Sequence, residues 1–455
     1  MSDFTGLKIT GRIATPSDPD WDEARLAWNL IADQRPEAVA FAESADDVAE
    51  VVRFAAENDL RVAGQGTGHG AAPLGPLEGT ILIKTERMRG IEIDPSSRTA
   101  RIEAGVLSAE LGAAAGEHRL SALPGSSPDV GTVGYTLGGG MSWLARAHGF
   151  ACNHVRGIEL VTADGEARTV DSENDPDLFW ALRGGGGGYA IVTALQLELL
   201  PVADLYAGAL VFPAAVGGEA VRIYRDWAAS LPDEVTSIVR FVTPPPIPDV
   251  PEPIRGVPLL TIGAACIGDQ SNGEATIAPL RASLGETIMD TFAQMPAAGL
   301  SHIHMDPENP VPGIGGGVTI AALPDEAVDA FTAATGPDSG SPLLLSELRH
   351  LGGAVGRPAE NGGALSHLDA DFVMYSVGMP MTSELGEAIH GHLRHLEEAM
   401  SPWAADGGYF NFTERPCDVD AILPAEVCSR LAEIKRAYDP EDRIVANHAV
   451  AIGPA

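Results

Sequence analysis

The spacing of apolar positions over residues 35–200 switches between two periods, which predicts alternating helices and strands. Ala45–Glu57 carries valines and alanines at helical spacing, with Ser44 placed as its N-terminal cap. The short runs predicted as strands are Leu60–Ala63, Thr80–Lys84, Ile91–Asp94, Thr99–Glu103 and Ile158–Thr162. The first part of the chain is therefore predicted to be an α+β domain.

A second region follows with strand and helix signals of its own. It is interrupted by a dense set of prolines: Pro244, Pro245, Pro246, Pro248, Pro251, Pro253 and Pro258. Proline fixes φ and removes a backbone donor, so this stretch is predicted to be an irregular loop without a regular element. There is no internal repeat and no low-complexity tract.

Composition and charge exclude several classes of function. The chain has 455 residues, enough for two or three domains, and 63 acidic against 29 basic residues give a formal net charge of −34. That charge would repel nucleic acid and anionic membranes. The acidic residues are dispersed, so solubility is the simplest consequence, and adaptation to salt stays open. No apolar run approaches the roughly 20 residues that span a bilayer. Met1–Arg12 lacks a signal-peptide pattern, so a cytoplasmic protein is expected.

The four cysteines are Cys152, Cys266, Cys417 and Cys428. They are too few for a disulfide framework in a chain of this length, and no spacing of cysteine or histidine suggests a metal site. Cys152 is therefore free for other chemistry.

Three glycine clusters carry the first functional signal: Gly64–Gly70, Gly131–Gly140 and Gly184–Gly188. The first follows a predicted strand and contains His69. Backbone N–H groups in such a turn can line a nest for a phosphate or pyrophosphate. A nicotinamide dehydrogenase of the Rossmann type is disfavoured, because a loop and another strand follow this turn where that fingerprint requires a helix.

The order of the motifs resembles the berberine bridge enzyme-like family of flavoprotein oxidases. After the His69 turn come GGGxxWLxRxxG at 138–149, Cys152, the run Glu159–Gly165, and Asp175–Gly186. Near the C-terminus, Tyr409–Phe412 is similar to the family's YxN[YF] signature, and Arg430–Pro440 with Asn447 beyond it also matches. The resemblance covers almost the whole chain and is weakest between about 205 and 340.

The resemblance implies an α+β fold. A PCMH-type FAD-binding domain made of two α/β subdomains would carry an inserted α+β substrate domain with an antiparallel sheet. The expected bounds are 1–204 for the FAD domain, 205–405 for the substrate domain and 406–455 for a C-terminal return to the FAD domain.

The family also implies bicovalently attached FAD. His69 matches the position of the 8α-histidyl bond and Cys152 that of the 6-S-cysteinyl bond. The family's Asp-Asn after this cysteine is Asn153-His154 here, which leaves open whether the second bond forms. Val155 matches a position where valine leaves room for O2 beside the flavin. Expected pyrophosphate contacts are Gln65, Gly66, Thr67, Gly68 and Gly70. Expected contacts with the rest of FAD are Gly134, Gly138, Gly139, Val192 and Asn447.

The candidate catalytic residues come from two places in the chain. Tyr409 and Asn411 are candidates for the group that deprotonates an alcohol or phenol, since a stabilised tyrosinate can act as a general base. Phe412 replaces a second tyrosine of other members, so the base can also lie elsewhere. Glu347, Arg349 and Tyr375 are further candidates on the sheet expected above the flavin, whereas His350 and His367 are expected to be structural.

The predicted function is an FAD-dependent oxidase. A hydroxyl- or amine-bearing carbon of a sugar, alkaloid or other natural product would give a hydride to flavin, and O2 would reoxidise the flavin with release of H2O2. Two alternatives stay open: a flavin-dependent dehydrogenase or tailoring enzyme that does not use O2 as a simple acceptor, and a flavin-binding protein without turnover. The sequence does not identify the natural substrate or the oligomeric state.

Overall fold

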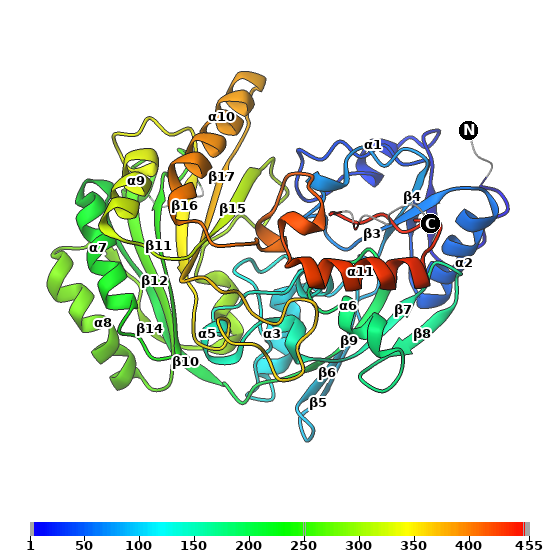
Figure 1. The fold of residues 1–455 in the computed structure, drawn as a ribbon, viewed down its shortest axis with the longest axis horizontal. Coiled ribbons are helices and arrows are strands. Elements are labelled where there is room, and N and C mark those ends of the chain that lie inside the picture. Colours follow the sequence, from blue (N-terminus) through cyan, green and yellow to red (C-terminus); the bar gives the residue numbers. More distant parts are fainter. Residues whose placement is uncertain (1–3, 249, 251, 449, 451–455) are drawn as a thin grey trace.

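The strands of a computed structural model, which describes residues 4–248, 250, 252–448 and 450, form three β-sheets. Two smaller sheets use residues 12–198, and one large sheet uses residues 204–378. The large sheet and its helices form one lobe and the two smaller sheets the other (Figure 1). The arrangement is α+β, as the sequence predicts.

The first sheet has the order β1-β2-β4-β3, and its last three strands are parallel. Its strands are β1 (Arg12–Ala14), β2 (Ala38–Phe41), β3 (Arg61–Gln65) and β4 (Thr80–Lys84). The short α1 (Trp21–Ala24) follows β1, and α2 (Ala45–Glu57) buries its valine face against β3 and β4. The Ser44 hydroxyl accepts a hydrogen bond from Asp47 N–H at 3.2 Å, which confirms the predicted cap and the bounds of this helix.

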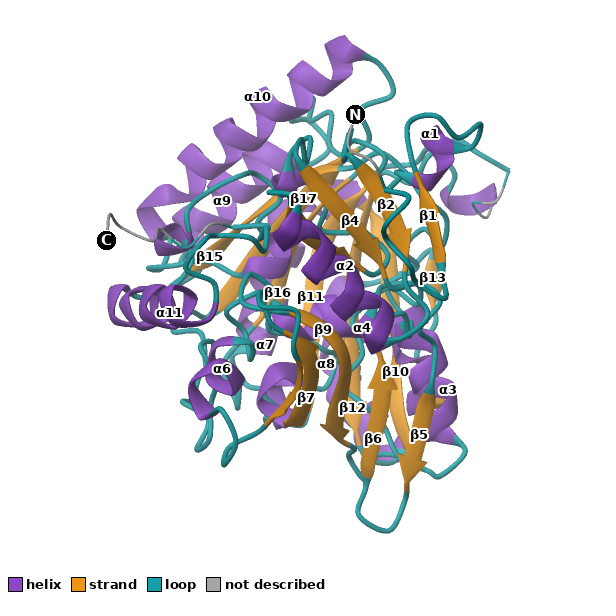
Figure 2. Ribbon diagram, turned by 90° about the vertical axis from the view of Figure 1, so that its right-hand side faces the viewer, coloured by secondary structure: helices purple, strands orange, loops and turns teal. Residues whose placement is uncertain are grey.

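The second sheet is antiparallel throughout, with the order β5-β6-β9-β7-β8. Its strands are β5 (Ile91–Asp94), β6 (Thr99–Glu103), β7 (Val155–Val161), β8 (Ala167–Val170) and β9 (Ile191–Glu198). The helices between them are α3 (Ser108–Gly116), α4 (Thr132–Leu137), α5 (Ala145–His148) and α6 (Pro176–Ala181). Figure 2 shows β5 and β6 as a projecting hairpin.

The third sheet is also antiparallel and runs β13-β10-β12-β11-β16-β17-β15, with β14 paired to β10. Its strands are β10 (Asp204–Pro213), β11 (Val235–Val242), β12 (Leu259–Ile267), β13 (Met289–Asp290), β14 (Ala293–Pro296), β15 (Ile314–Ile320), β16 (Leu345–His350) and β17 (Phe372–Gly378). The outer face is covered by α7 (Gly217–Ala228), α8 (Gln270–Leu284), α9 (Asp325–Thr335) and α10 (Ser383–Met400), as Figure 1 shows. Apolar residues of 123–151 pack on the opposite face, so that face borders the first lobe.

The last helix, α11 (Ala425–Tyr438), returns to the first lobe and packs on α6. The buried Lys435 ammonium donates to the carbonyls of Gly188 and Ile444 and to Asp439. Ile444 also forms a parallel bridge with Val62 of β3. The domain bounds at 204 and 405 remain our proposal.

Three local expectations need correction. The strand predicted at Leu60–Ala63 is β3, which begins at Arg61 and continues into the glycine turn, and the strand predicted at Ile158–Thr162 is β7, which already begins at Val155. The proline-rich stretch contains one 3-10 turn, Glu252–Ile254, because proline is tolerated in a first turn. β4, β5 and β6 have the predicted bounds.

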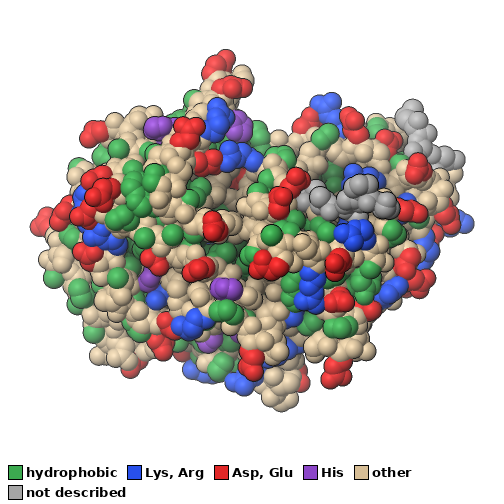
Figure 3. All heavy atoms as spheres, viewed as in Figure 1, with side chains coloured by type: hydrophobic (Ala, Val, Ile, Leu, Met, Phe, Trp, Pro, Cys, Tyr) green, Lys and Arg blue, Asp and Glu red, His purple; other side chains and the backbone are tan. Residues whose placement is uncertain are grey.

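Acidic side chains lie scattered over the face shown in Figure 3 and do not gather into one patch. Within the described ranges, no helix combines the length and the apolar character needed to cross a membrane.

Candidate active site

His69 lies in the glycine turn that follows β3, and three side chains fix its ring. The Trp28 indole stacks on it at 3.9 Å between ring centroids, with planes 16° apart. Thr67 Oγ1 lies 2.8 Å from Nδ1, and Asp129 Oδ1 lies 3.5 Å from Nε2. Gly68 adopts a φ of 87°, and a Cβ there would lie 2.8 Å from Ala27 Cβ, so the turn requires glycine.

Asp129 is held as an anion next to this imidazole. Its carboxylate accepts hydrogen bonds from Trp28 Nε1–H at 2.5 Å and from the Ser127 hydroxyl at 2.8 Å. Burial raises the pKa of Asp129, but the contacts with His69 and Ser127 outweigh burial and hold the pKa below its ordinary value. A carboxylate beside Nε2 favours the tautomer with hydrogen on Nε2, which leaves the lone pair on Nδ1.

Cys152 lies in a 3-10 turn, Ala151–His154, and is fully buried. Its N–H donates to Gly139 O at 2.8 Å, and its thiol lies 3.5 Å from Leu365 O. Burial raises the pKa of the Cys152 thiol to about 12. The thiol is therefore neutral in the protein alone and would need a bound electrophile or a nearby base to react as a thiolate.

Asn153, which stands where the family has aspartate, makes hydrogen bonds that explain the difference. Asn153 Nδ2–H donates to Ser366 O at 3.2 Å, and Asn153 Oδ1 accepts from Gly363 N–H at 3.1 Å. An amide can both donate and accept in this way, whereas a carboxylate could only accept. Val155 begins β7 directly after this turn and is buried.

The predicted cofactor contacts fall into two groups. Gln65 and the glycines around His69 share one turn, where Asn447 Nδ2–H donates to Gly70 O. Gly138 and Gly139 instead pack against Asn411 and Tyr409. The remaining two are Gly134, where a Cβ would meet no atom within 4 Å, and the buried Val192 on β9.

The C-terminal motif Tyr409–Phe412 forms an aromatic cluster with Tyr375. Phe412 lies 4.6 Å from the ring of Tyr375 and 5.0 Å from that of Tyr409, between centroids. The Arg349 guanidinium lies 4.9 Å from the centre of the Phe412 ring. Asn411 Nδ2–H donates to Tyr135 O at 2.9 Å and to the Tyr409 hydroxyl at 3.1 Å.

The electrostatics of this group argue against a tyrosinate in the protein alone. Burial raises the pKa of Tyr409 above its ordinary value, and the hydrogen bond with Asn411 offsets only part of the shift. Burial likewise raises the pKa of Tyr375, whose hydroxyl donates to Glu414 Oε1 at 2.5 Å. Burial also raises the pKa of Glu414, which makes this carboxylate the stronger base.

Glu347 and Arg349 lie on β16 and are in contact, as the sequence suggests for neighbouring positions on one face of a strand. Arg349 Nε–H donates to Glu347 Oε1 at 2.5 Å. Burial raises the pKa of Glu347, but Arg349 and His304 outweigh it, so the pKa lies well below its ordinary value. Such a carboxylate is a poor general base, which disfavours the catalytic role considered for Glu347.

Sequence reasoning missed Trp28, Tyr135, Asp129, His304, Asp306 and Glu414. Asp129 follows a serine-rich turn two residues before Gly131, and His304 and Asp306 stand two apart. These spacings could have marked them as polar candidates, but no pattern indicated their partners.

The residues in the turn fit FAD. His69 Nε2 and Gln65 Oε1 are buried polar atoms without a hydrogen-bond partner in the described part of the chain, and Gly134 leaves open space. The described residues contain no group of three or more potential metal ligands.

Comparisons with known proteins identify relatives of this chain. A family described as an FAD binding domain matches residues 36–171. The (R)-6-hydroxynicotine oxidase of Paenarthrobacter nicotinovorans is 29% identical over 98% of this chain and 98% of its own length. The solved 6-hydroxy-D-nicotine oxidase of Arthrobacter nicotinovorans has a TM-score of 0.84 and 26% identity, over 100% of both chains.

Two solved structures at lower identity share the fold. Berberine bridge enzyme-like protein 1 of Physcomitrella patens has a TM-score of 0.85 and 19% identity over 98% of both chains. The glucooligosaccharide oxidase of Acremonium strictum has a TM-score of 0.80 and 21% identity, over 98% of this chain and 97% of that one. The name of the latter structure states a 6-S-cysteinyl, 8α-N1-histidyl FAD. The comparisons confirm the predicted PCMH-type fold class.

Proposed function

We propose that this chain, which belongs to the berberine bridge enzyme-like family of FAD-linked oxidoreductases, oxidises a hydroxyl- or amine-bearing carbon of a small natural product. FAD would be held by two covalent bonds, one to His69 and one to Cys152. O2 would be the electron acceptor and H2O2 the second product.

One observation carries the proposal: the segment 131–140 contacts the surroundings of both attachment residues. Gly131 N–H donates to Thr67 Oγ1 at 3.4 Å, next to His69 in the turn. At the other end of the segment, Gly139 O accepts from Cys152 N–H. Two residues far apart in the sequence are thus held at either end of one glycine-rich segment, which supports attachment of a single ligand at both.

The side chains have separable roles in such a reaction. Bound FAD would supply the hydride acceptor and pass the electrons to O2. The neutral Tyr409 hydroxyl, held by Asn411, would donate a hydrogen bond to the reacting oxygen or nitrogen. Glu414 and Tyr375 together offer a carboxylate of raised pKa that could take up the substrate proton. The Phe412 ring is in contact with the rings of both Tyr375 and Tyr409.

The test combines anaerobic and aerobic measurements on the purified holoprotein. A panel of sugars, alkaloids and hydroxylated aromatic compounds is screened anaerobically for loss of the visible flavin absorbance. Any compound that bleaches the flavin is then assayed with O2 for one H2O2 per turnover. Bleaching without peroxide would indicate the dehydrogenase alternative. Failure of every compound to bleach the flavin would favour a non-catalytic flavin protein.

Replacing Val155 by leucine is expected to slow reoxidation by O2 about tenfold and to leave anaerobic reduction nearly unchanged. Val155 is buried at the start of β7, so an added methylene must occupy space beside the proposed flavin. Stopped-flow absorbance measures the two half-reactions separately. Val161→Leu, at the other end of the same strand, is the control. Equal reoxidation rates in Val155→Leu and wild type would remove Val155 from this role.

Asp129→Asn is expected to slow formation of the His69 bond roughly tenfold, the effect of losing one nearby negative charge. The carboxylate keeps hydrogen on Nε2, so its loss leaves fewer His69 rings with a free lone pair on Nδ1. Intact mass during FAD loading measures attachment in a Cys152→Ala background, where His69 is the sole proposed link. The exposed Asp164→Asn is the control. An unchanged rate of attachment would show that Asp129 has no part in it.

A further inference from the structure

A buried network of charged side chains connects the large sheet to the loop after residue 302. His304 Nε2 lies 2.7 Å from Glu347 Oε2, and His304 Nδ1 lies 2.5 Å from Asp306 Oδ1. Arg349 binds the other Glu347 oxygen. Arg240 of β11 donates to His304 O at 3.0 Å and to the Thr261 hydroxyl at 2.9 Å. Glu347, His304 and Arg240 are all at most 5% exposed, so solvent screens these charges little.

Two carboxylates of this network are held as anions. The pKa values of Glu347 and Asp306 are both held below their ordinary ranges: burial raises them, and the neighbouring cations outweigh burial. Both carboxylates are therefore hydrogen-bond acceptors, and the two ring nitrogens of His304 lie within hydrogen-bond distance of them. Arg240 and Arg349 face the same two carboxylates. A buried guanidinium is costly unless each of its N–H groups finds an acceptor.

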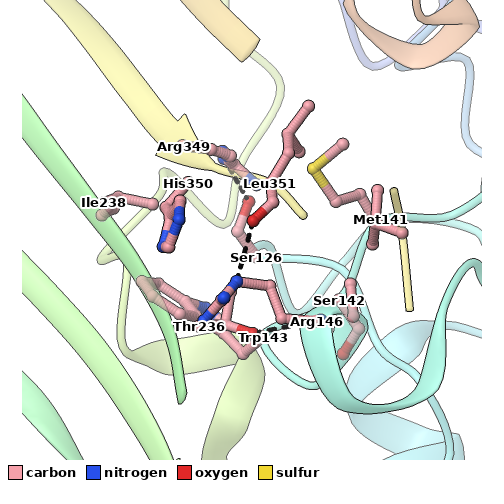
Figure 4. A pocket seen from close by; sticks show the side chains of 12 residues that line it. Ser126, Met141, Ser142, Trp143, Arg146, Thr236, Ile238, Arg349, His350 and Leu351 are labelled. Carbon is pink, nitrogen blue, oxygen red and sulfur yellow. Dashed lines mark hydrogen bonds between the residues drawn. The ribbon is translucent and has the colours of Figure 1, made fainter. Parts of the chain in front are cut away.

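Arg349 is the member of the network that reaches a cavity. The cavity lies between residues 126–146 of the first lobe and strands β11 and β16 (Figure 4). Arg349 Nη2–H donates to Ser126 Oγ at 3.3 Å, shown as a dashed line in Figure 4. Within the described residues, no hydrogen-bond partner is found for Arg349 Nη1. Of the two terminal nitrogens of this guanidinium, Nη1 is thus available, and Nη2 is held only by the long hydrogen bond to Ser126.

The other basic groups around this cavity are not available. Arg146 donates to four backbone carbonyls, those of Leu231, Pro232, Val235 and Leu351. Burial, with the nearby Arg146, lowers the pKa of His350 to about 3, so its imidazole is neutral. The cavity has a volume of about 10 Å³, so it admits a single small group, and Arg349 is the charged donor that it offers to such a group.

The position of Arg349 relates it to the proposed chemistry. Its guanidinium lies over Phe412, whose ring also contacts Tyr409 and Tyr375. A ligand group bound by Arg349 would therefore lie beside the candidate catalytic residues. A planar guanidinium matches an anionic oxygen pair or a single ionised oxygen on an aromatic ring.

We propose that Arg349 binds an anionic oxygen of the substrate, so that the substrate class is a small molecule bearing a carboxylate or an ionised ring hydroxyl. This inference rests on the proposed function, because it places the substrate beside Phe412 and Tyr409. A neutral sugar would offer the free nitrogen of Arg349 no anionic acceptor, and the proposal therefore disfavours unmodified sugars among the substrates.

The test uses unreactive ligand pairs on the FAD-loaded protein. The probes are benzoate against benzamide, and pentafluorophenol, which is ionised at neutral pH, against pentafluorobenzene. Perturbation of the flavin absorbance and calorimetry give the dissociation constants. Each anion is expected to bind at least about tenfold more tightly than its neutral partner, the equivalent of about 1.4 kcal/mol. Comparison of the two pairs distinguishes a carboxylate site from a phenolate site.

Arg349→Met is expected to abolish the preference for anions, and Arg349→Lys to retain part of it. The lysine variant keeps the charge next to Glu347, so it separates loss of recognition from loss of folding, which thermal unfolding monitors. The exposed Arg357→Met is the control and should keep the full preference. Equal binding of anions and neutral partners by the wild-type protein, or an undiminished preference in Arg349→Met, would overturn the proposal.

Failure of this inference differs from failure of the proposed function. The ligand pairs are not turned over, so their preference is measured whether or not any compound reduces the flavin. An oxidase without anion preference loses only the role of Arg349. A protein that prefers anions but is reduced by no compound in the panel loses only the oxidase assignment.

Discussion

Replacing both His69 and Cys152 by alanine is expected to release all flavin when the protein is denatured in acid. Each single variant should keep FAD on the chain through its remaining bond. The physical basis is the arrangement around segment 131–140, which holds His69 and Cys152 near its two ends. Intact mass and the absorbance of the acid supernatant measure the attached fraction, which should fall from nearly complete to none in the double variant.

Cys266→Ala is the matched control for this experiment. Cys266 is also buried, and burial raises its pKa to about 12, as for Cys152, but it lies on β12 of the large sheet. Its loss should leave attachment unchanged. Release of flavin from the wild-type protein would refute both bonds, whereas release from His69→Ala alone would show that the Cys152 bond does not form on its own.

Glu347→Ala is expected to destabilise the protein by about 3–5 kcal/mol, the typical cost of removing one partner from a buried ion pair. Glu347 is 0% exposed and pairs with Arg349 and His304, so its loss leaves the Arg349 and Arg240 guanidiniums facing Asp306 alone. At roughly 2 °C per kcal/mol, the thermal midpoint should fall by about 5–10 °C. The control is the exposed Glu360→Ala. A midpoint within about 1 °C of wild type would contradict the buried network.

The same network predicts how stability depends on pH. A carboxyl whose pKa is lower in the folded state stabilises the protein above its unfolded pKa and loses that contribution as pH falls toward the folded value. The pKa values of Glu347 and Asp306 are both lowered, so wild-type stability should decrease from about pH 5 downward. Glu347→Gln removes one of these groups, and its thermal midpoint should fall less steeply over that range. Parallel curves would contradict an ionised Glu347.

Much of the fold was predictable because local rules decide it. The periodicity of Ala45–Glu57 and its Ser44 cap gave the bounds of α2, and the short runs at β4, β5 and β6 had the correct limits. β3 and β7 were misplaced by a few residues because each extends up to a turn that carries a candidate site residue. β3 pairs with β4 as far as Gln65, and β7 pairs with β9 from Val155 onward, so each strand extends beyond its apolar run. The neighbouring strand decides where such pairing ends.

The candidate site also has a part that sequence motifs indicated and a part that only folding brought together. The glycine turn, His69, Cys152 and the Tyr409–Phe412 motif could be read from the chain because each is a contiguous pattern. The partners of His69 could not, since Trp28 and Asp129 come from separate segments and meet it only in the folded protein. The sequence also could not rank Glu347 against Glu414. Two glutamates with the same ordinary pKa shift in opposite directions after folding. Burial raises the pKa of Glu414, whereas at Glu347 the effects of Arg349 and His304 outweigh burial and lower the pKa.

The sequence by itself thus determined the α+β class, and the resemblance of its motifs indicated the flavoprotein family and the residues proposed to carry FAD, since a motif is a pattern along one chain. The tertiary structure alone decided which side chains hold His69 and which glutamate is paired with a cation, since Glu347 contacts Arg349 and Glu414 does not. It also decided that Arg349 retains a free nitrogen at a cavity. Those properties depend on burial and on distances between segments, and a carboxylate or guanidinium acquires its chemistry from neighbours that only folding supplies.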